Sequence, residues 1–152
     1  MHELEQLSER IRRHIPVTRS LAFSFTEWQP GLLVMEAPLA QHSNDKGTFF
    51  AGSQAALFTL AGWALTTLEA ERGQVRADVL ATDNQLTYTA PLTSDMVIRV
   101  TAAEQELQLF NERLARKGRA RLAVKAEGLA KAAQATASSW EGQYLARLIG
   151  DS

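Results

Sequence analysis

Polar side chains with catalytic potential gather in one loop, residues 42–52, directly before a long apolar segment. Asp45 could act there as a general base or a nucleophile, and Asn44 could position a water molecule or a carbonyl group. Lys46 could neutralise a phosphate or pair with Asp45. The alternatives are an ordinary turn, in which an Asn or Asp side chain bonds its own backbone, and a solvent-exposed lysine. The loop therefore fits acid–base or nucleophilic chemistry as well as a structural turn.

The chain changes from polar loop to apolar helix at Gly52 and Ser53. A helix start leaves backbone N–H groups without partners and carries a partial positive charge, so it can hold a carbonyl oxygen, a thiolate or a phosphate. The N–H groups of Gly52 and Ser53 could stabilise a developing oxyanion in this way. In the structural alternative, Gly52 lets the helix pack closely and Ser53 is its N-cap.

Three further polar residues are candidates because of their position relative to this helix. Thr48 and Thr59 offer hydroxyl groups near the helix, although Thr59 could instead bond back to a carbonyl of its own helix. Asp83 interrupts an otherwise apolar strand. It could supply a carboxylate if that strand crosses the helix start of a second subunit, and the alternative is a solvent-facing strand position.

Composition and charge argue against several classes of function. The formal net charge of −1, from 16 basic and 17 acidic residues, gives no reason to expect a nucleic acid or a membrane as partner. The chain has no cysteine, and its three histidines are widely spaced, so we expect no metal site and no cofactor. The N-terminus lacks the apolar stretch of a signal peptide. We therefore expect a soluble, cytoplasmic protein.

The sequence predicts two helices, one directly after the loop and one at the N-terminus. Apolar residues between Gln54 and Leu68 fall on nearly every side of a helical projection, which predicts a central helix over 52–70 that is buried all round. Gly73 stands where a glycine usually follows a helix end. An amphipathic helix is expected over residues 1–15 and should stop at Pro16.

The remaining segments have the patterns of strands. We expect strands at 21–26, 32–35, 79–89, 96–101, from 119 onward, and 131–140. Gln29-Pro30-Gly31 predicts the first turn, Gly118 should end a short helix around 107–114, and Gly128 suggests a turn before the last strand. Runs of antiparallel strands around one helix indicate an α+β fold, with residues 1–152 forming a single domain.

This order of elements, together with the sequence of the loop and helix, resembles the hotdog fold, in which an antiparallel sheet of about five to six strands wraps a long central helix. More specifically, the chain resembles the thioesterase family typified by the YiiD C-terminal domain. The residues that carry the likeness, over roughly 16–146, are Asn44, Lys46, Gly47, Thr48, Gly52, Ser53, Leu60, Trp63, Tyr88, Pro91, Gly142 and Tyr144.

The resemblance implies a homodimer whose two sheets join edge to edge, and which can pair further into a dimer of dimers. It also implies hydrolysis of acyl-CoA or acyl-carrier-protein thioesters at the subunit interface, with the carbonyl held at the start of the central helix. The substrate-binding residues are then expected to be Lys46, Gly47, Thr48, Gly52, Ser53 and Thr59, beside the catalytic candidates Asn44, Asp45 and Asp83. A basic cluster could meet the phosphates of coenzyme A or form a solvated surface: Arg113, Arg116, Lys117, Arg119 and Arg121.

The sequence departs from better understood hotdog thioesterases at two places. Phe50-Ala51-Gly52 stands where those proteins have a His-Gly-Gly triplet, and Thr59 stands where they have a helical carboxylate. These departures favour, as a second hypothesis, a non-catalytic acyl-CoA-binding module. A hydroxyacyl dehydratase is a third, disfavoured because its usual pair of a histidine and a carboxylate is not evident in the loop.

Overall fold

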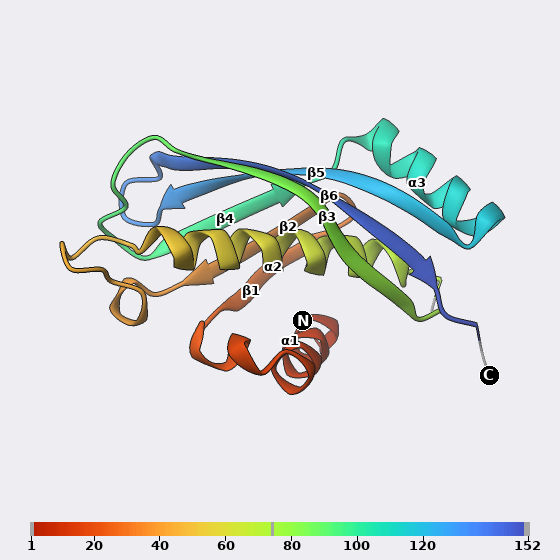
Figure 1. Cartoon of the computed structure of the whole chain (residues 1–152), viewed down its shortest axis with the longest axis horizontal. Helices are drawn as coiled ribbons and strands as arrows, with labels where there is room; N and C mark the ends of the chain where they lie inside the picture. The colour runs from red at the N-terminus through yellow and green to blue at the C-terminus, as the bar shows by residue number, and fades with distance from the viewer. Residues whose placement is uncertain (1, 74, 151–152) are drawn as a thin grey trace.

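The computed structural model describes residues 2–73 and 75–150 (Figure 1). Its helices are α1 (His2–His14), α2 (Ala51–Ala70) and α3 (Glu104–Lys117), with 3₁₀ turns at Pro16–Ser20 and Leu39–Gln41. Its strands are β1 (Ser24–Gln29), β2 (Leu32–Ala37), β3 (Ala77–Tyr88), β4 (Met96–Thr101), β5 (Arg119–Ala130) and β6 (Thr136–Leu148).

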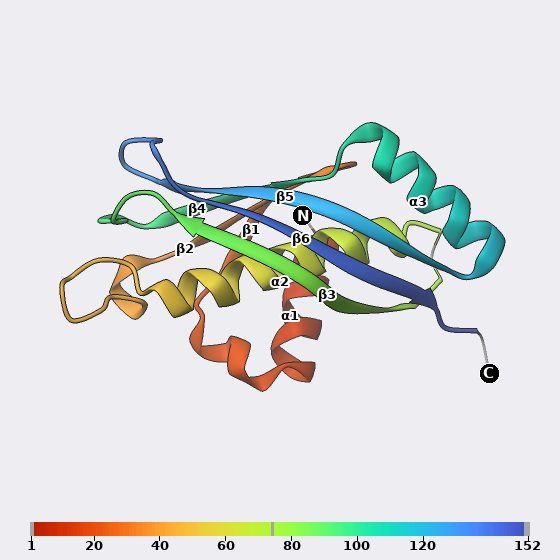
Figure 2. The same cartoon turned by 45° about the horizontal axis from the view of Figure 1, so that its top comes forward.

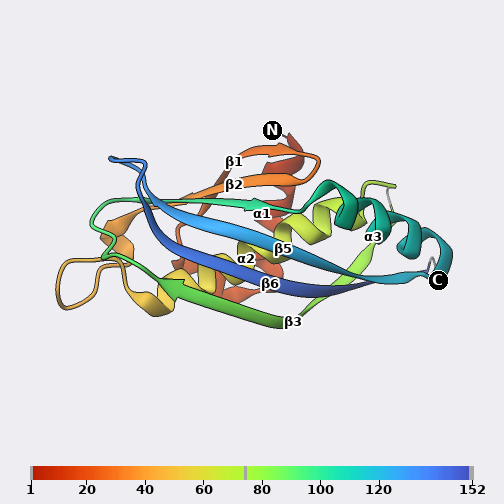
Figure 3. The ribbon, with the colours of Figure 1, turned by 90° about the horizontal axis from the view of Figure 1, so that it is seen from above.

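The described strands form one six-stranded sheet in the order β1-β2-β4-β5-β6-β3, and every neighbouring pair is antiparallel. Figure 3 shows β1 at one edge of this sheet and β3 at the other. The sheet curves over α2, and α1 lies below α2 (Figures 1 and 2). The predicted α+β architecture, an antiparallel sheet wrapped around a central helix, is confirmed.

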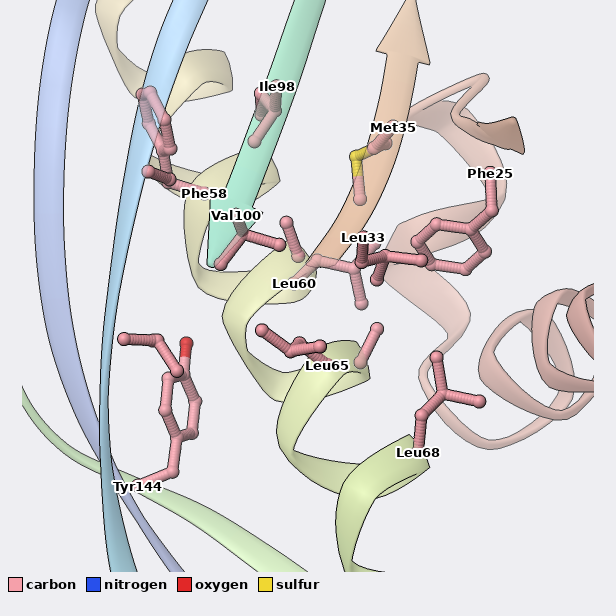
Figure 4. Packing of buried hydrophobic residues seen from close by; sticks show 14 of the residues in the cluster. Phe25, Leu33, Met35, Phe58, Leu60, Leu65, Leu68, Ile98, Val100 and Tyr144 are labelled. Atoms are coloured by element: carbon pink, nitrogen blue, oxygen red, sulfur yellow. The ribbon is translucent and has the colours of Figure 1, made fainter. Parts of the chain in front are cut away.

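Helix α2 is buried because apolar side chains surround it. Leu57, Phe58 and Leu65 are fully buried, and Leu60 and Leu65 lie beside side chains of β2 and β4 (Figure 4). Burying one such side chain stabilises the fold by about 1.5–3 kcal/mol. The helix therefore holds the sheet together and fixes the loop that precedes it.

Helix α2 approaches β6 closely at Gly62. A Cβ atom at this position would lie 2.6 Å from the hydroxyl of Tyr144 and 2.5 Å from the ring of Trp140. The Tyr144 hydroxyl points at α2 (Figure 4) and donates a hydrogen bond of 2.6 Å to the carbonyl of Thr59. Gly62 is therefore required by a close approach between a helix backbone and an aromatic side chain.

The two ends of α2 are attached differently. At the C-terminal end of α2, the Glu71 side chain accepts two hydrogen bonds from Arg10 of α1, at 2.7 and 3.2 Å. It accepts a third from the N–H of Ala77 at the beginning of β3. At its start, the Tyr88 hydroxyl at the end of β3 donates to the carbonyl of Ala51. Strand β3 therefore runs alongside α2, in the opposite direction.

Three predictions about element ends are wrong. Gly73 does not end α2 in a left-handed conformation, since the helix ends at Ala70 and Glu71 is its C-cap. Gly128 lies inside β5, where a Cβ atom would collide with Ser138 and Met96, so it serves close packing and not a turn. The last strand spans Thr136–Leu148 because the alanine-rich segment before it forms the turn. The left-handed Gly31 and Gly118, at a turn and at a helix end, are confirmed.

Candidate functional site

The start of α2 offers three backbone N–H groups. Phe50 is the N-cap, in an extended conformation without a side-chain cap, and its carbonyl accepts the first helical hydrogen bond, from Gln54. Among the residues that the structure describes, no acceptor is paired with the N–H groups of Ala51, Gly52 and Ser53. The proposed N-cap role of Ser53 is therefore wrong, because the helix begins earlier. Three N–H donors stand at the positive end of the helix dipole.

The preceding loop is built around Asn44. Its Oδ1 accepts hydrogen bonds from the N–H groups of Lys46 and Thr48, at 2.9 and 3.1 Å, and its Nδ2 donates to the hydroxyl of Thr48. Gly47 lies between them with φ of 76°, a left-handed conformation that glycine adopts without strain. Asn44 therefore fills the predicted turn role, and it fixes the shape of the loop.

A hollow of about 500 Å³ lies where this loop meets the helix start. It is lined by Gln41, His42, Ser43, Asn44, Asp45, Lys46, Phe50, Ala51 and Ser53. Asp45 and Lys46 form an ion pair of 3.1 Å, and their side chains are 82% and 75% exposed. The structure thus brings a carboxylate, an ammonium group and helix-start residues to one hollow.

His42 has a structural role at this hollow. Its side chain is buried, its ring stacks on Phe49 with a centroid separation of 5.0 Å, and its Nε2 donates to the carbonyl of Leu21 at 2.6 Å. Its own carbonyl accepts the N–H of Phe50. His42 therefore holds the residue that caps α2.

Five predicted site residues do not line the hollow: Gly47 and Thr48 belong to the loop, Gly52 to the helix start, and Thr59 and Asp83 to other parts of the fold. The Thr59 hydroxyl donates to the carbonyl of Ala55 at 2.9 Å, which is the structural alternative stated for it. Asp83 pairs with Gln143, whose side chain points away from α2, on what we call the outer face of the sheet. Within one protomer the sheet therefore separates Asp83 from the start of α2.

A β-bulge accounts for the orientation of Asp83. Strict alternation would place Asp83 on the same side as Ala81, which faces α2, but the register shifts between these two residues, so that one extra residue changes the side. Its neighbour Asn84, opposite Gly142, takes the side that faces α2 and is exposed there. The alternation of polar and apolar residues in the sequence cannot show that Asp83 and Asn84 have changed sides of the sheet.

Two contributors to the site were not predicted. Tyr88 holds the helix start through its 2.7 Å hydrogen bond to Ala51, and burial raises the pKa of Tyr88. Ala51 supplies one of the free N–H groups because Phe50 is the N-cap. Tyr88 was named only as part of the family resemblance, because its contact with Ala51 crosses 37 positions. Ala51 gave no signal, since phenylalanine is not a usual N-cap residue.

The family model described as "Putative thioesterase (yiiD_Cterm)" matches residues 4–148. The chain belongs to this family. This membership confirms the resemblance stated from the loop and helix residues. The family description indicates a thioesterase and names no acyl group or carrier.

Solved structures share the fold over almost the whole chain. A protein of unknown function from Chlorobaculum tepidum TLS is 24% identical with a TM-score of 0.85, and covers 94% of this chain and 93% of its own. A structure described as a "putative thioesterase" from Shewanella oneidensis is 26% identical with a TM-score of 0.81, and covers 95% of this chain and 98% of its own. A thioesterase from Haemophilus influenzae is 14% identical with a TM-score of 0.76, over 97% and 92%. The hotdog fold is therefore shown.

The described residues contain neither a metal-binding cluster nor a membrane-spanning helix. In the ranges 2–73 and 75–150, no three His, Asp or Glu side chains are grouped so that they could hold a metal ion. None of the helices described has the length and apolar character needed to cross a membrane.

Proposed function

We propose that this protein hydrolyses acyl thioesters of coenzyme A or of acyl carrier protein, with the thioester carbonyl held at the start of α2. The observation that carries this proposal is the set of three free N–H groups, of Ala51, Gly52 and Ser53, beside the hollow of the preceding loop. Such donors stabilise the negative charge that develops on the carbonyl oxygen when a nucleophile adds to the carbon.

Asp45 is the carboxylate that this proposal uses. It lines the hollow that Ala51 and Ser53 also line. As a general base it would take a proton from water while the water oxygen adds to the carbonyl carbon. Collapse of the tetrahedral intermediate breaks the carbon–sulfur bond, and the proton passes to the leaving thiolate. The products are a carboxylic acid and the free thiol of the carrier.

We infer that the functional unit is a homodimer formed through β3. The outer edge of β3 has no neighbouring strand among the described elements, and residues 80–88 are exposed or half-buried. The exposed or half-buried positions of α2 up to Trp63 are Ala51, Gly52, Ser53, Ala55, Ala56, Thr59 and Trp63. Four of them, Gly52, Ala56, Thr59 and Trp63, form one stripe. Trp63 donates a hydrogen bond to the carbonyl of Val79 in β3, so the stripe lies toward this edge. A second copy would cover both features.

A second candidate function is a non-catalytic module that binds acyl thioesters. The exposure of Asp45, together with the position of Asp83 on the outer face, favours it, because among the described residues no carboxylate is held against the free N–H groups. Both candidate functions require that the protein binds an acyl thioester, and only the first requires that it hydrolyses the thioester.

The deciding experiment measures free-thiol release from a panel of acyl-CoA and acyl-carrier-protein thioesters. Asp45→Asn should lower kcat by about 10²–10⁴-fold, the usual contribution of a general base. Asp83→Asn makes the same chemical change on the outer face, and it should leave kcat within about twofold. Loss of turnover in Asp83→Asn alone would transfer the role of base to Asp83 of a partner subunit. Binding without turnover in the wild type would establish the non-catalytic module.

A further inference from the structure

Two aromatic side chains are exposed at the start of α2. Among the exposed large apolar side chains of residues 2–73 and 75–150, only Phe50 and Tyr88 are aromatic, and they are 54% and 46% exposed. Both contact the first turn of α2, because the Phe50 ring lies against Gly52 and the Tyr88 hydroxyl donates to the carbonyl of Ala51. Large apolar side chains left exposed beside a candidate site indicate that a ligand covers them.

The position of the Phe50 ring is fixed. A Cβ atom on Gly52 would lie 2.6 Å from Cε2 of Phe50 and 3.0 Å from its Cζ, so the ring occupies the place of a side chain at residue 52. The N–H of Phe50 donates to the carbonyl of His42 at 2.7 Å, and its own carbonyl accepts from Gln54 at 3.1 Å. The ring therefore stands beside the free N–H groups of the helix start without having to move there when a ligand binds.

The two rings lie on the same side of α2. Gly52, which the Phe50 ring covers, belongs to the stripe of α2 that lies toward β3. Tyr88 comes from β3 itself, and its hydrogen bond to Ala51 shows that its side chain points at α2. Both rings belong to one subunit, so their arrangement does not depend on the inferred dimer.

The hollow beside this turn offers an acyl group little other apolar surface. Among the residues that line it, only Phe50 and Ala51 are apolar. A long alkyl chain would remove polar side chains from water along most of its length without giving them hydrogen bonds, which is unfavourable. An aromatic ring needs only one apolar wall, and two aromatic rings attract each other beyond the effect of the area that they bury.

We propose that Phe50 determines the specificity for the acyl group, and that the favoured acyl groups carry an aromatic ring. This ring packs against Phe50 and Tyr88 while the thioester carbonyl accepts hydrogen bonds from the free N–H groups of the same helix start. The proposal rests on the proposed thioester site and names its substrate class. It also gives a role to Phe50 at the position where the better understood hotdog thioesterases have a histidine.

The test compares two thioesters with the same carbon skeleton, phenylpropanoyl and cyclohexylpropanoyl, each on the carrier that the wild type uses. Both rings are separated from the carbonyl by the same methylene groups, so the carbonyl reactivity is equal. The ratio of the two kcat/KM values should favour the phenyl compound in the wild type. Phe50→Leu keeps an apolar side chain and should lower this ratio about three- to tenfold, the contribution of an aromatic pair. Phe50→Tyr should retain the ratio.

Leu109→Ala is the control for the loss of an exposed apolar side chain. Leu109 lies on α3, is 44% exposed and does not line the hollow, so the ratio should stay unchanged in this variant.

Gly52→Ala displaces the Phe50 ring and keeps every N–H group. The added Cβ atom would lie 2.6 Å from the ring, so the ring must turn away. The ratio should therefore fall as it does in Phe50→Leu, and it should fall no further in the double variant, because both changes remove the same wall. Tyr88→Phe and Tyr88→Leu both lose the hydroxyl that holds Ala51. A lower ratio in Tyr88→Leu than in Tyr88→Phe therefore measures the second ring.

The failure of this proposal can be told apart from the failure of the proposed function. Hydrolysis with a ratio that is unchanged in Phe50→Leu overturns the specificity and leaves the thioesterase intact. If no thioester is hydrolysed, NMR titration with phenylpropanoate and cyclohexylpropanoate, followed at the amide signal of Gly52, decides the matter. Phenylpropanoate binding that weakens about three- to tenfold in Phe50→Leu supports recognition of an aromatic group without hydrolysis. Equal binding of the two acids, or no change in the Gly52 signal, refutes it.

Discussion

Glu69 is a buried carboxyl group whose energetics depend on pH. Its side chain is fully covered, and it accepts a 2.7 Å hydrogen bond from the N–H of Gly31 and a 3.4 Å contact from Arg72. Burial raises the pKa of Glu69 above its ordinary value of 4.5, against the lowering effect of these two partners. This single residue ties the turn between β1 and β2 to the end of α2.

The raised pKa predicts how Glu69→Gln changes stability. Because the folded protein binds this proton more tightly than the unfolded chain, the stabilisation from Glu69 is present below pH 4.5 and is lost as the pH rises through its folded-state pKa. Gln keeps an acceptor for Gly31 and does not ionise. Between pH 4 and pH 7 the free energy of unfolding of the variant should therefore rise relative to that of the wild type, as measured by urea denaturation. A relative fall over this range would contradict the prediction.

The start of α2 can be tested as an element by removing one of its donors. Ala51→Pro deletes an N–H group at the first helical position, where proline is favoured. Phe50 already has the extended backbone that precedes proline, with φ of −61° and ψ of 132°. The fold should therefore survive, while kcat for thioester hydrolysis falls about 10²–10³-fold if this donor stabilises the oxyanion.

Ala55→Ser is a suitable control for this variant, since it alters α2 one turn further on and keeps every N–H group. It should leave kcat unchanged, and circular dichroism should show the same helix content in all three proteins. Unchanged kcat in Ala51→Pro would restrict the oxyanion donors to Gly52 and Ser53, and would contradict a role for all three N–H groups.

The elements themselves were largely predictable from the sequence, because their signals are local. The all-round apolar pattern of α2 and the alternation of β5 predicted type and approximate extent. The failures have non-local causes. Gly128 was predicted to form a turn, but it is a glycine because the Ser138 side chain on the next strand leaves no room for a Cβ atom. Asp83 changed face through a bulge. At both positions, contacts with residues distant in the sequence determine the structural role.

The candidate site was predictable in part for the same reason. Asn44, Asp45 and Lys46 are neighbours in the chain, so their loop could be located, and its turn chemistry is carried by adjacent residues. The hydrogen bond from Tyr88 to Ala51 joins β3 to α2, and no local pattern predicts a contact across 37 positions.

At the scale of the whole molecule, the inferred dimer explains why an otherwise well-covered helix has one uncovered stripe. Ala56 lies on this stripe and is exposed in the protomer, so that a larger side chain there meets only solvent in a single chain. In the dimer the same position faces the second copy. A charge placed there would be buried without a partner, which costs several kcal/mol.

Ala56→Arg should therefore yield a folded monomer, whereas the wild type should have the mass of a dimer when measured by size-exclusion chromatography with light scattering. Ala123→Arg is the matched control, because Ala123 is an exposed alanine on the outer face of β5, and this variant should remain dimeric. Since we propose the dimer as the functional unit, thioester hydrolysis by Ala56→Arg should fall with the fraction of dimer and return at high protein concentration. A monomeric wild type, or an Ala56→Arg dimer with full activity, would show that the stripe on α2 is covered by something other than a second copy.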